Sequence, residues 1–153
     1  MKMKKIVLGL FLIGITLLLT GCEKKKPITV EDFTKAVEQK EYKIVERRLL
    51  SDYPETNTIV SAEIKENNYI ELFDIKTEED AKNFFTTNKN HYEKEYKVKT
   101  ITTENTGINY NKYTLTVKNN YIVISRINNT VIIVEADKNN KKEVKNFLKE
   151  IGY

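Results

Sequence analysis

Residues 117–135 read VKNNYIVISRINNTVIIVE and contain the most apolar strand that the sequence predicts. Two Asn-Asn pairs, at 119–120 and 128–129, flank the apolar run 121–127, and the run 131–135 follows. Asn tolerates positive φ and favours turns. Because connections this short join antiparallel strands only, the stretch predicts two successive β-hairpins.

Further strands are predicted on the N-terminal side of this stretch. Residues 59–64 form one, residues 65–68 turn, and residues 69–75 return with Tyr69, Glu71 and Phe73 on one face. A strand near residues 98–101, a polar loop through Gly107 and a strand over 113–117 follow. Residues 42–50 suggest a strand or an irregular extended segment.

Three helices are predicted from capping signals and helical spacing. Thr29 with Asp32, and Thr77 with Asp80, have capping-box spacing and open helices over about 30–40 and 78–95. Asn140 can cap a last helix that ends at Gly152.

The predicted fold class is α+β: a mostly antiparallel sheet of about 5–7 strands, with three helices packed on one face. The motif Asn-Asn-Tyr-Ile occurs at 67–70 and 119–122, each time after a helix and extended segments. Two helix-plus-meander halves would explain this recurrence. Chance in an Asn-rich sequence is the alternative.

The N-terminal residues have the pattern of an export signal. Residues 1–5 carry three lysines, and residues 6–19 are largely apolar but too short for a membrane helix. The run ends in Leu19, Thr20, Gly21 and Cys22, the only cysteine. This tetrapeptide resembles the lipobox of bacterial lipoprotein precursors.

The lipobox resemblance implies an export signal and a lipid anchor. Leu19, Thr20 and Gly21 would be read by a signal peptidase that cuts before Cys22, and a diacylglyceryl group would sit on Cys22. Residues 1–21 would then be the signal peptide, 22–28 the lipidated tether and 29–153 one domain, on the extracytoplasmic side of the cell membrane. Two acyl chains give lasting anchorage. An uncleaved anchor with an incidental cysteine remains the alternative.

Charge gives no support for nucleic-acid binding. The formal net charge is +4, but three of the lysines lie in residues 1–21, so the mature chain is nearly neutral. Glu23 and then Lys24, Lys25 and Lys26 follow Cys22. These lysines either meet an anionic membrane surface or belong to a solvated linker.

Motifs for catalysis are scarce in this sequence. His91 is the only histidine, which excludes histidine-based metal clusters, and no serine lies in a nucleophile-elbow sequence. Residues 78–80 are acidic and suit a helix start better than a cation site. No cofactor and no metal is expected, although two carboxylates of a hydrolase would leave no sequence signature.

Arg126 is the leading candidate for ligand or partner contact, together with Tyr121 and Tyr69. Arg126 shares a strand face with Ile122 and Ile124, so it is either a rim arginine or a pocket arginine that grips a carboxylate. Arg47 and Arg48 are expected to be solvated.

The sequence therefore favours a non-enzymatic, lipid-anchored surface protein that binds an envelope protein or a small ligand. An envelope-polymer hydrolase that uses carboxylates is one alternative. An accessory subunit of a membrane complex is another.

Overall fold

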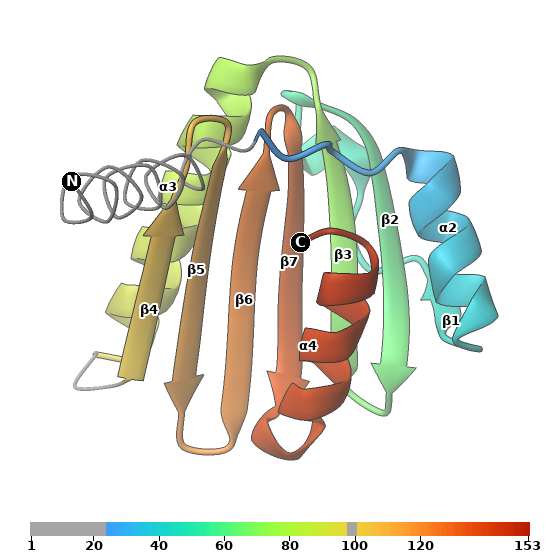
Figure 1. Ribbon diagram of the computed structural model, residues 1–153, viewed down its shortest axis with the longest axis vertical. Helices are drawn as coiled ribbons and strands as arrows, with labels where there is room; N and C mark the ends of the chain where they lie inside the picture. The colour runs from blue at the N-terminus through green and yellow to red at the C-terminus, as the bar shows by residue number, and fades with distance from the viewer. Residues whose placement is uncertain (1–23, 98–100) are drawn as a thin grey trace, which may run out of the picture.

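A seven-stranded antiparallel sheet is the centre of the molecule (Figure 1). The structure, a computed structural model, describes residues 24–97 and 101–153, so residues 19–22 lie outside the described part. Within that part the strand order is β1-β2-β3-β7-β6-β5-β4. The strands are β1 Lys43–Val45, β2 Thr56–Lys65, β3 Asn68–Ile75, β4 Ile101–Thr106, β5 Tyr110–Val117, β6 Asn120–Ile127 and β7 Thr130–Asp137.

Helices cover both faces of the sheet, and not one face as the sequence predicted (Figure 1). Helices α2 (Val30–Gln39) and α4 (Lys141–Glu150) pack on one face, and α3 (Glu78–Glu95) packs on the other. Within the described residues these three helices and the sheet confirm the α+β fold class. In both halves of the chain, a helix precedes a run of antiparallel strands. Strand β7 joins the two halves, because it pairs with β3 on one side and with β6 on the other.

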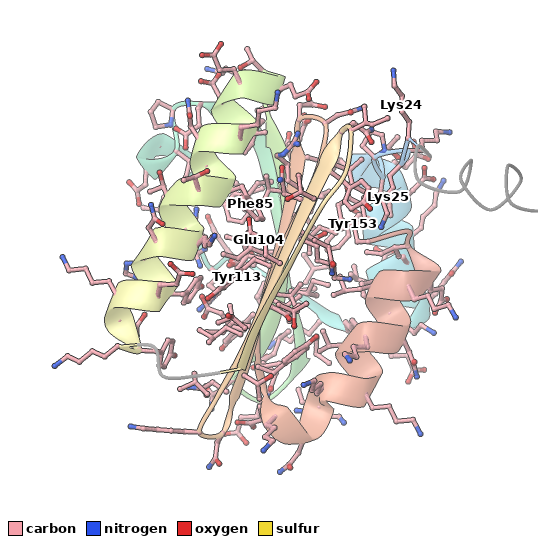
Figure 2. All side chains as sticks on the ribbon, turned by 60° about the vertical axis from the view of Figure 1, so that its left-hand side comes forward. Lys24, Lys25, Phe85, Glu104, Tyr113 and Tyr153 are labelled. Atoms are coloured by element: carbon pink, nitrogen blue, oxygen red, sulfur yellow. The ribbon has the colours of Figure 1, made fainter. Side chains whose placement is uncertain are left out.

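Apolar side chains on both sides of the central strands explain the two layers. In β3, Ile70 and Leu72 face α2 and α4, whereas Phe73 packs in the cluster under α3. Strand β7 is buried continuously from Thr130 to Val134. Figure 2 shows Phe85 and Tyr113 on the α3 side and Tyr153 on the α4 side. A single helix layer would leave half of this apolar surface in water.

The predicted caps are confirmed for two helices and wrong for the third. Thr29 accepts from the backbone N–H of Asp32, and Thr77 accepts from that of Asp80. Asn140 precedes α4 but caps nothing with its side chain. Its amide donates to Asn68 Oδ1, which joins α4 to the sheet instead.

Two strand boundaries differ from the prediction. Residues 102–106, predicted as a polar loop, form most of β4, because β5 supplies a pairing partner along its whole length. In the β5–β6 turn, Lys118 takes the positive φ and Asn120 already pairs with Val117. Asn128 has a positive φ in the β6–β7 turn, as predicted.

The sheet has two distinct ends (Figure 1). The β4–β5 and β6–β7 turns lie at one end, where the chain before α2 also passes. The β2–β3 and β5–β6 turns lie at the other end. Strands of eight residues separate the ends by roughly 26 Å.

Candidate functional site

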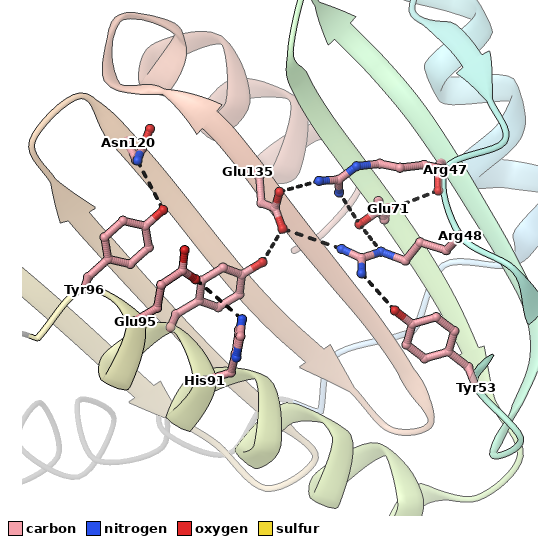
Figure 3. Close-up of polar contacts among 11 residues, drawn as sticks. Arg47, Arg48, Tyr53, Glu71, His91, Glu95, Tyr96, Asn120 and Glu135 are labelled. Atoms are coloured by element: carbon pink, nitrogen blue, oxygen red, sulfur yellow. Dashed lines mark hydrogen bonds and ion pairs between the residues drawn. The ribbon is translucent and has the colours of Figure 1, made fainter.

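A cluster of opposite charges lies on the α3 face of the sheet (Figure 3). After β1 the chain leaves the sheet edge, and Arg47 and Arg48 reach across to Glu71 of β3 and Glu135 of β7. Arg47 Nη1 and Arg48 Nε are each 2.8 Å from Glu71 Oε2. Arg47 Nη2 is 2.6 Å from Glu135 Oε2, and Arg48 Nη2 is 3.5 Å from Glu135 Oε1. The expectation that both arginines are solvated is therefore wrong for Arg48, which is half-buried, whereas Arg47 is exposed and is also paired with both carboxylates.

Glu71 forms the buried centre of this charge cluster. Its side chain is 1% exposed, and Ser61 donates to its other oxygen at 2.9 Å. The Arg47 guanidinium also lies 4.4 Å from the centroid of the Tyr69 ring. A buried carboxylate without partners is strongly destabilising, so these donors explain why a glutamate is tolerated in the middle of β3.

Glu135 joins the charge cluster to α3. It accepts a hydrogen bond from the hydroxyl of Tyr92 and one from Arg47. Burial alone would raise the pKa of Glu135, but these bonds and the charges of both arginines outweigh it and lower the pKa. Burial and the neighbouring Glu135 raise the pKa of Tyr92 well above its usual value. Glu135 thus stays ionised while Tyr92 keeps its donor proton.

A cleft of about 460 Å³ opens beside this cluster. We call it the α3 cleft. One wall is α3 and the opposite wall is formed by Arg48 and Tyr53. Strand residues such as Glu135 and Ile122 form the floor of the cleft. Asn67 and Asn120 line the cleft at the end of the sheet that carries the β2–β3 and β5–β6 turns. The α3 wall consists of Asn88, His91, Tyr92, Glu95 and Tyr96.

Hydrogen-bonding groups dominate the lining of the α3 cleft. Asn120 donates to the hydroxyl of Tyr96 at 3.2 Å, and His91 Nε2 lies 3.5 Å from Glu95 (Figure 3). Arg48 donates to the Tyr53 hydroxyl at 2.8 Å, which fixes the wall opposite α3. Within residues 24–97 and 101–153, no group of three His, Cys, Asp or Glu side chains could hold a metal ion. The lining suits a polar ligand that makes many hydrogen bonds.

The structure does not bring the three sequence candidates together. Arg126 lies on the α3 face near the β6–β7 turn, Tyr69 stacks under Arg47, and Tyr121 is buried on the opposite face. The Nζ of Lys141 lies 5.0 Å from the Tyr121 ring centroid. None of the three lines the α3 cleft, and their contact with a ligand remains a prediction.

Arg126 is buried and does not lie at the rim of the sheet. It is 2% exposed, and its Nε donates to Asn111 Oδ1 at 2.9 Å. Its Nη1 donates to the carbonyl of Asn128 at 2.8 Å and lies 3.5 Å from Glu78. Burial lowers its pKa. These contacts tie the β6–β7 turn to β5 and to the start of α3.

The sequence contains a signal for the charge cluster. Glu71 alternates with Tyr69 and Phe73 on one strand face, and Glu135 follows an apolar run. A carboxylate on an otherwise apolar strand face requires a buried cation nearby. The adjacent arginines at 47–48 are the only arginines before residue 126, so they were the available partners.

Comparison with protein-family models, with curated protein sequences and with solved structures finds no match to this chain. Among the described helices, none combines the length and the apolar character that a membrane crossing requires.

Proposed function

We propose that this protein is a lipid-anchored, non-enzymatic binding module at the outer face of the cell membrane, and that the α3 cleft holds a small polar ligand. The observation that carries the ligand site is the α3 cleft itself, whose wall residues are held by the Arg48–Tyr53 and Tyr92–Glu135 hydrogen bonds. Preorganised polar groups reduce the ordering cost of binding. The anchor rests on the lipobox resemblance of residues 19–22.

The place of the α3 cleft in the fold supports this proposal. Asn67 and Asn120 line it at the β2–β3 and β5–β6 turns, whereas the residues after the expected anchor run past the opposite end of the sheet (Figure 1). A domain held at that opposite end would present the cleft roughly 26 Å from the anchor. A ligand outside the membrane could then reach it.

The state of Glu135 favours binding over carboxylate-based hydrolysis. A glycoside hydrolase needs one carboxyl group with a raised pKa to donate a proton. The pKa of Glu135 is lowered, and its oxygens are occupied by Tyr92 and the two arginines. Its geometry therefore serves to fix the cleft and not to supply an acid.

Ligand binding can be tested by two-dimensional amide NMR of the chain from residue 22, with Cys22→Ser, titrated with envelope-derived sugars, amino acids and short peptides. We expect at least one compound to shift the amide signals of His91, Tyr92 and Tyr96. His91→Ala, which removes an exposed hydrogen-bonding side chain, should lower the binding affinity for that compound by about fivefold.

The matched control is Lys82→Ala on the same helix, whose side chain is exposed and does not line the cleft. It should leave the affinity unchanged. A panel that produces no shifts at the α3 cleft, or shifts that gather on another surface, would contradict the proposed site.

A further inference from the structure

The residues that follow the expected anchor are fixed to one end of the sheet. The backbone N–H of Lys25 donates to Asn109 Oδ1 at 3.0 Å, and its carbonyl accepts from Asn109 Nδ2 at 2.7 Å. Asn109 also donates to Asn128 Oδ1 at 2.8 Å, so one side chain links residue 25 to two turns. Lys25 Nζ lies 4.7 Å from the Tyr110 ring centroid. Residue 25 is therefore held on the domain.

The β4–β5 turn at this end presents an exposed apolar side chain. Ile108 is 57% exposed, which is unusual for an isoleucine in this structure. The turn is tight, because a Cβ on Gly107 would lie 2.0 Å from Tyr110 Cε1. Gly107 thus lets the Tyr110 ring pack under Lys25 while Ile108 points outward into the surroundings.

Lysines gather on the α4 side of the sheet next to this turn. Lys25 lies over the Tyr110 ring, and Lys112 lies two residues later on the same face of β5. Burial lowers the pKa of Lys112, and the charges of Lys25 and Lys145 lower it further. Lys112 Nζ donates to the carbonyl of Tyr153 at 3.0 Å. Figure 2 shows Lys25 and Tyr153 on this side of the sheet.

The acidic side chains of α4 and β4 are paired with other lysines, and those of the first turn of α3, Glu78, Glu79 and Asp80, lie on the other face of the sheet. Glu143 and Glu150 of α4 pair with Lys65 and Lys40 on the α2 side. Glu104 of β4 lies on the α3 side with Lys89. Within the described residues no Asp or Glu lies within 4.0 Å of the following lysines, which we call the basic face: Lys24, Lys25, Lys26, Lys112 and Lys145.

We propose that the basic face and Ile108 form a docking surface for anionic lipid headgroups, which sets the orientation of the domain on the membrane. This inference rests on the proposed membrane location. Lys25 lies three residues after Cys22, a span of at most about 11 Å, and residue 25 is fixed to the sheet. The turn that carries Ile108 is therefore held within reach of the bilayer surface. Lysines near an anionic surface and an inserted apolar side chain both add to membrane binding.

The first test is vesicle sedimentation of the chain from residue 22 with Cys22→Ser, which retains every described element. We expect binding to vesicles of phosphatidylcholine with phosphatidylglycerol, release at high salt, and no binding to phosphatidylcholine alone. Lys112→Gln with Lys145→Gln should lower the partition by about fivefold for each lysine removed.

The matched control is Lys82→Gln with Lys94→Gln, which removes the same charge from α3 on the other face. This control should bind as the parent chain does. Equal loss in both double variants, equal binding to the two vesicle types, or binding only to soluble polyphosphate would overturn the proposal. Because Cys22 is replaced throughout, the result does not depend on whether the lipid anchor exists.

The orientation is tested with an environment-sensitive fluorophore on Ile108→Cys or Glu66→Cys in the same Cys22→Ser chain. Glu66 is exposed in the β2–β3 turn, at the other end of the sheet. We expect a blue shift with anionic vesicles at position 108 and none at position 66. The same response at both positions, or a response at position 66 alone, would contradict the orientation.

Discussion

Glu71 and Glu135 hold Arg47 and Arg48 in one charge cluster, and Glu78 lies against Arg126. The sequence singled out Arg126 for its apolar strand and treated Arg47 and Arg48 as solvated, yet all three side chains are engaged with carboxylates. The error has a physical reason. Strand alternation tells which face a residue occupies, but whether a charge is paired depends on segments far away in sequence, such as residue 47 against residue 135.

Glu71 is the residue on which the charge cluster depends. Replacing it by Ala should destabilise the domain by about 3 kcal/mol, because Arg47 and Arg48 lose their buried partner and a hole is left. Urea unfolding followed by circular dichroism measures this. Glu31→Ala, which breaks the exposed Glu31–Lys35 pair, is the control and should cost only a few tenths of a kcal/mol. Similar losses in the two variants would contradict the assignment.

Glu135 should make stability depend on pH in the acid range. Its folded-state pKa is lowered, whereas an unfolded glutamate titrates near about 4.3. The stabilisation is therefore complete above that value and is lost as the pH falls through the folded pKa. Urea unfolding of the parent chain and of Glu135→Gln should show a stability difference that shrinks below about pH 4.3. A difference that stays constant to lower pH would contradict the ionised state of Glu135.

Secondary-structure elements were predicted well where local chemistry decides them. The capping boxes at Thr29 and Thr77 and the positive φ at Asn128 follow from side-chain hydrogen bonding and turn preference. The strand predicted near residues 98–101 extends through residue 106 as β4, because β5 pairs with its polar residues regardless. The faces of the sheet were also assigned incompletely. Apolar residues on both sides of β3 and β7 already required two helical layers.

The cap of α3 can be tested by a single substitution. Thr77→Ala removes the acceptor for the Asp80 backbone N–H and should cost about 1 kcal/mol. Thr86→Ala lies within the same helix, where Ala is the better helix former, and should be neutral or slightly stabilising. Thermal or urea unfolding compares the two. A larger loss from Thr86→Ala than from Thr77→Ala would show that the cap is not what starts the helix.

At the scale of the whole molecule, the sheet separates two surfaces. The α3 cleft lies at the end with the β2–β3 and β5–β6 turns, and Lys25 is fixed at the end with the β4–β5 and β6–β7 turns. The sequence predicted the fold class but not this arrangement, because a strand order is set by pairings between distant segments such as β3 with β7. The proposed anchored end and the proposed ligand-binding end therefore lie at opposite ends of the sheet.

The anchor is the central claim, and Cys22 tests it most directly because it is the only cysteine in the chain. The measurement is incorporation of labelled palmitate and membrane fractionation in a bacterium that exports the protein, for the parent chain and for Cys22→Ala. We predict that the parent carries the label and stays with the membrane. The variant should take up no label and should either leave the membrane or keep residues 1–21. Normal processing together with membrane retention of Cys22→Ala would contradict the account.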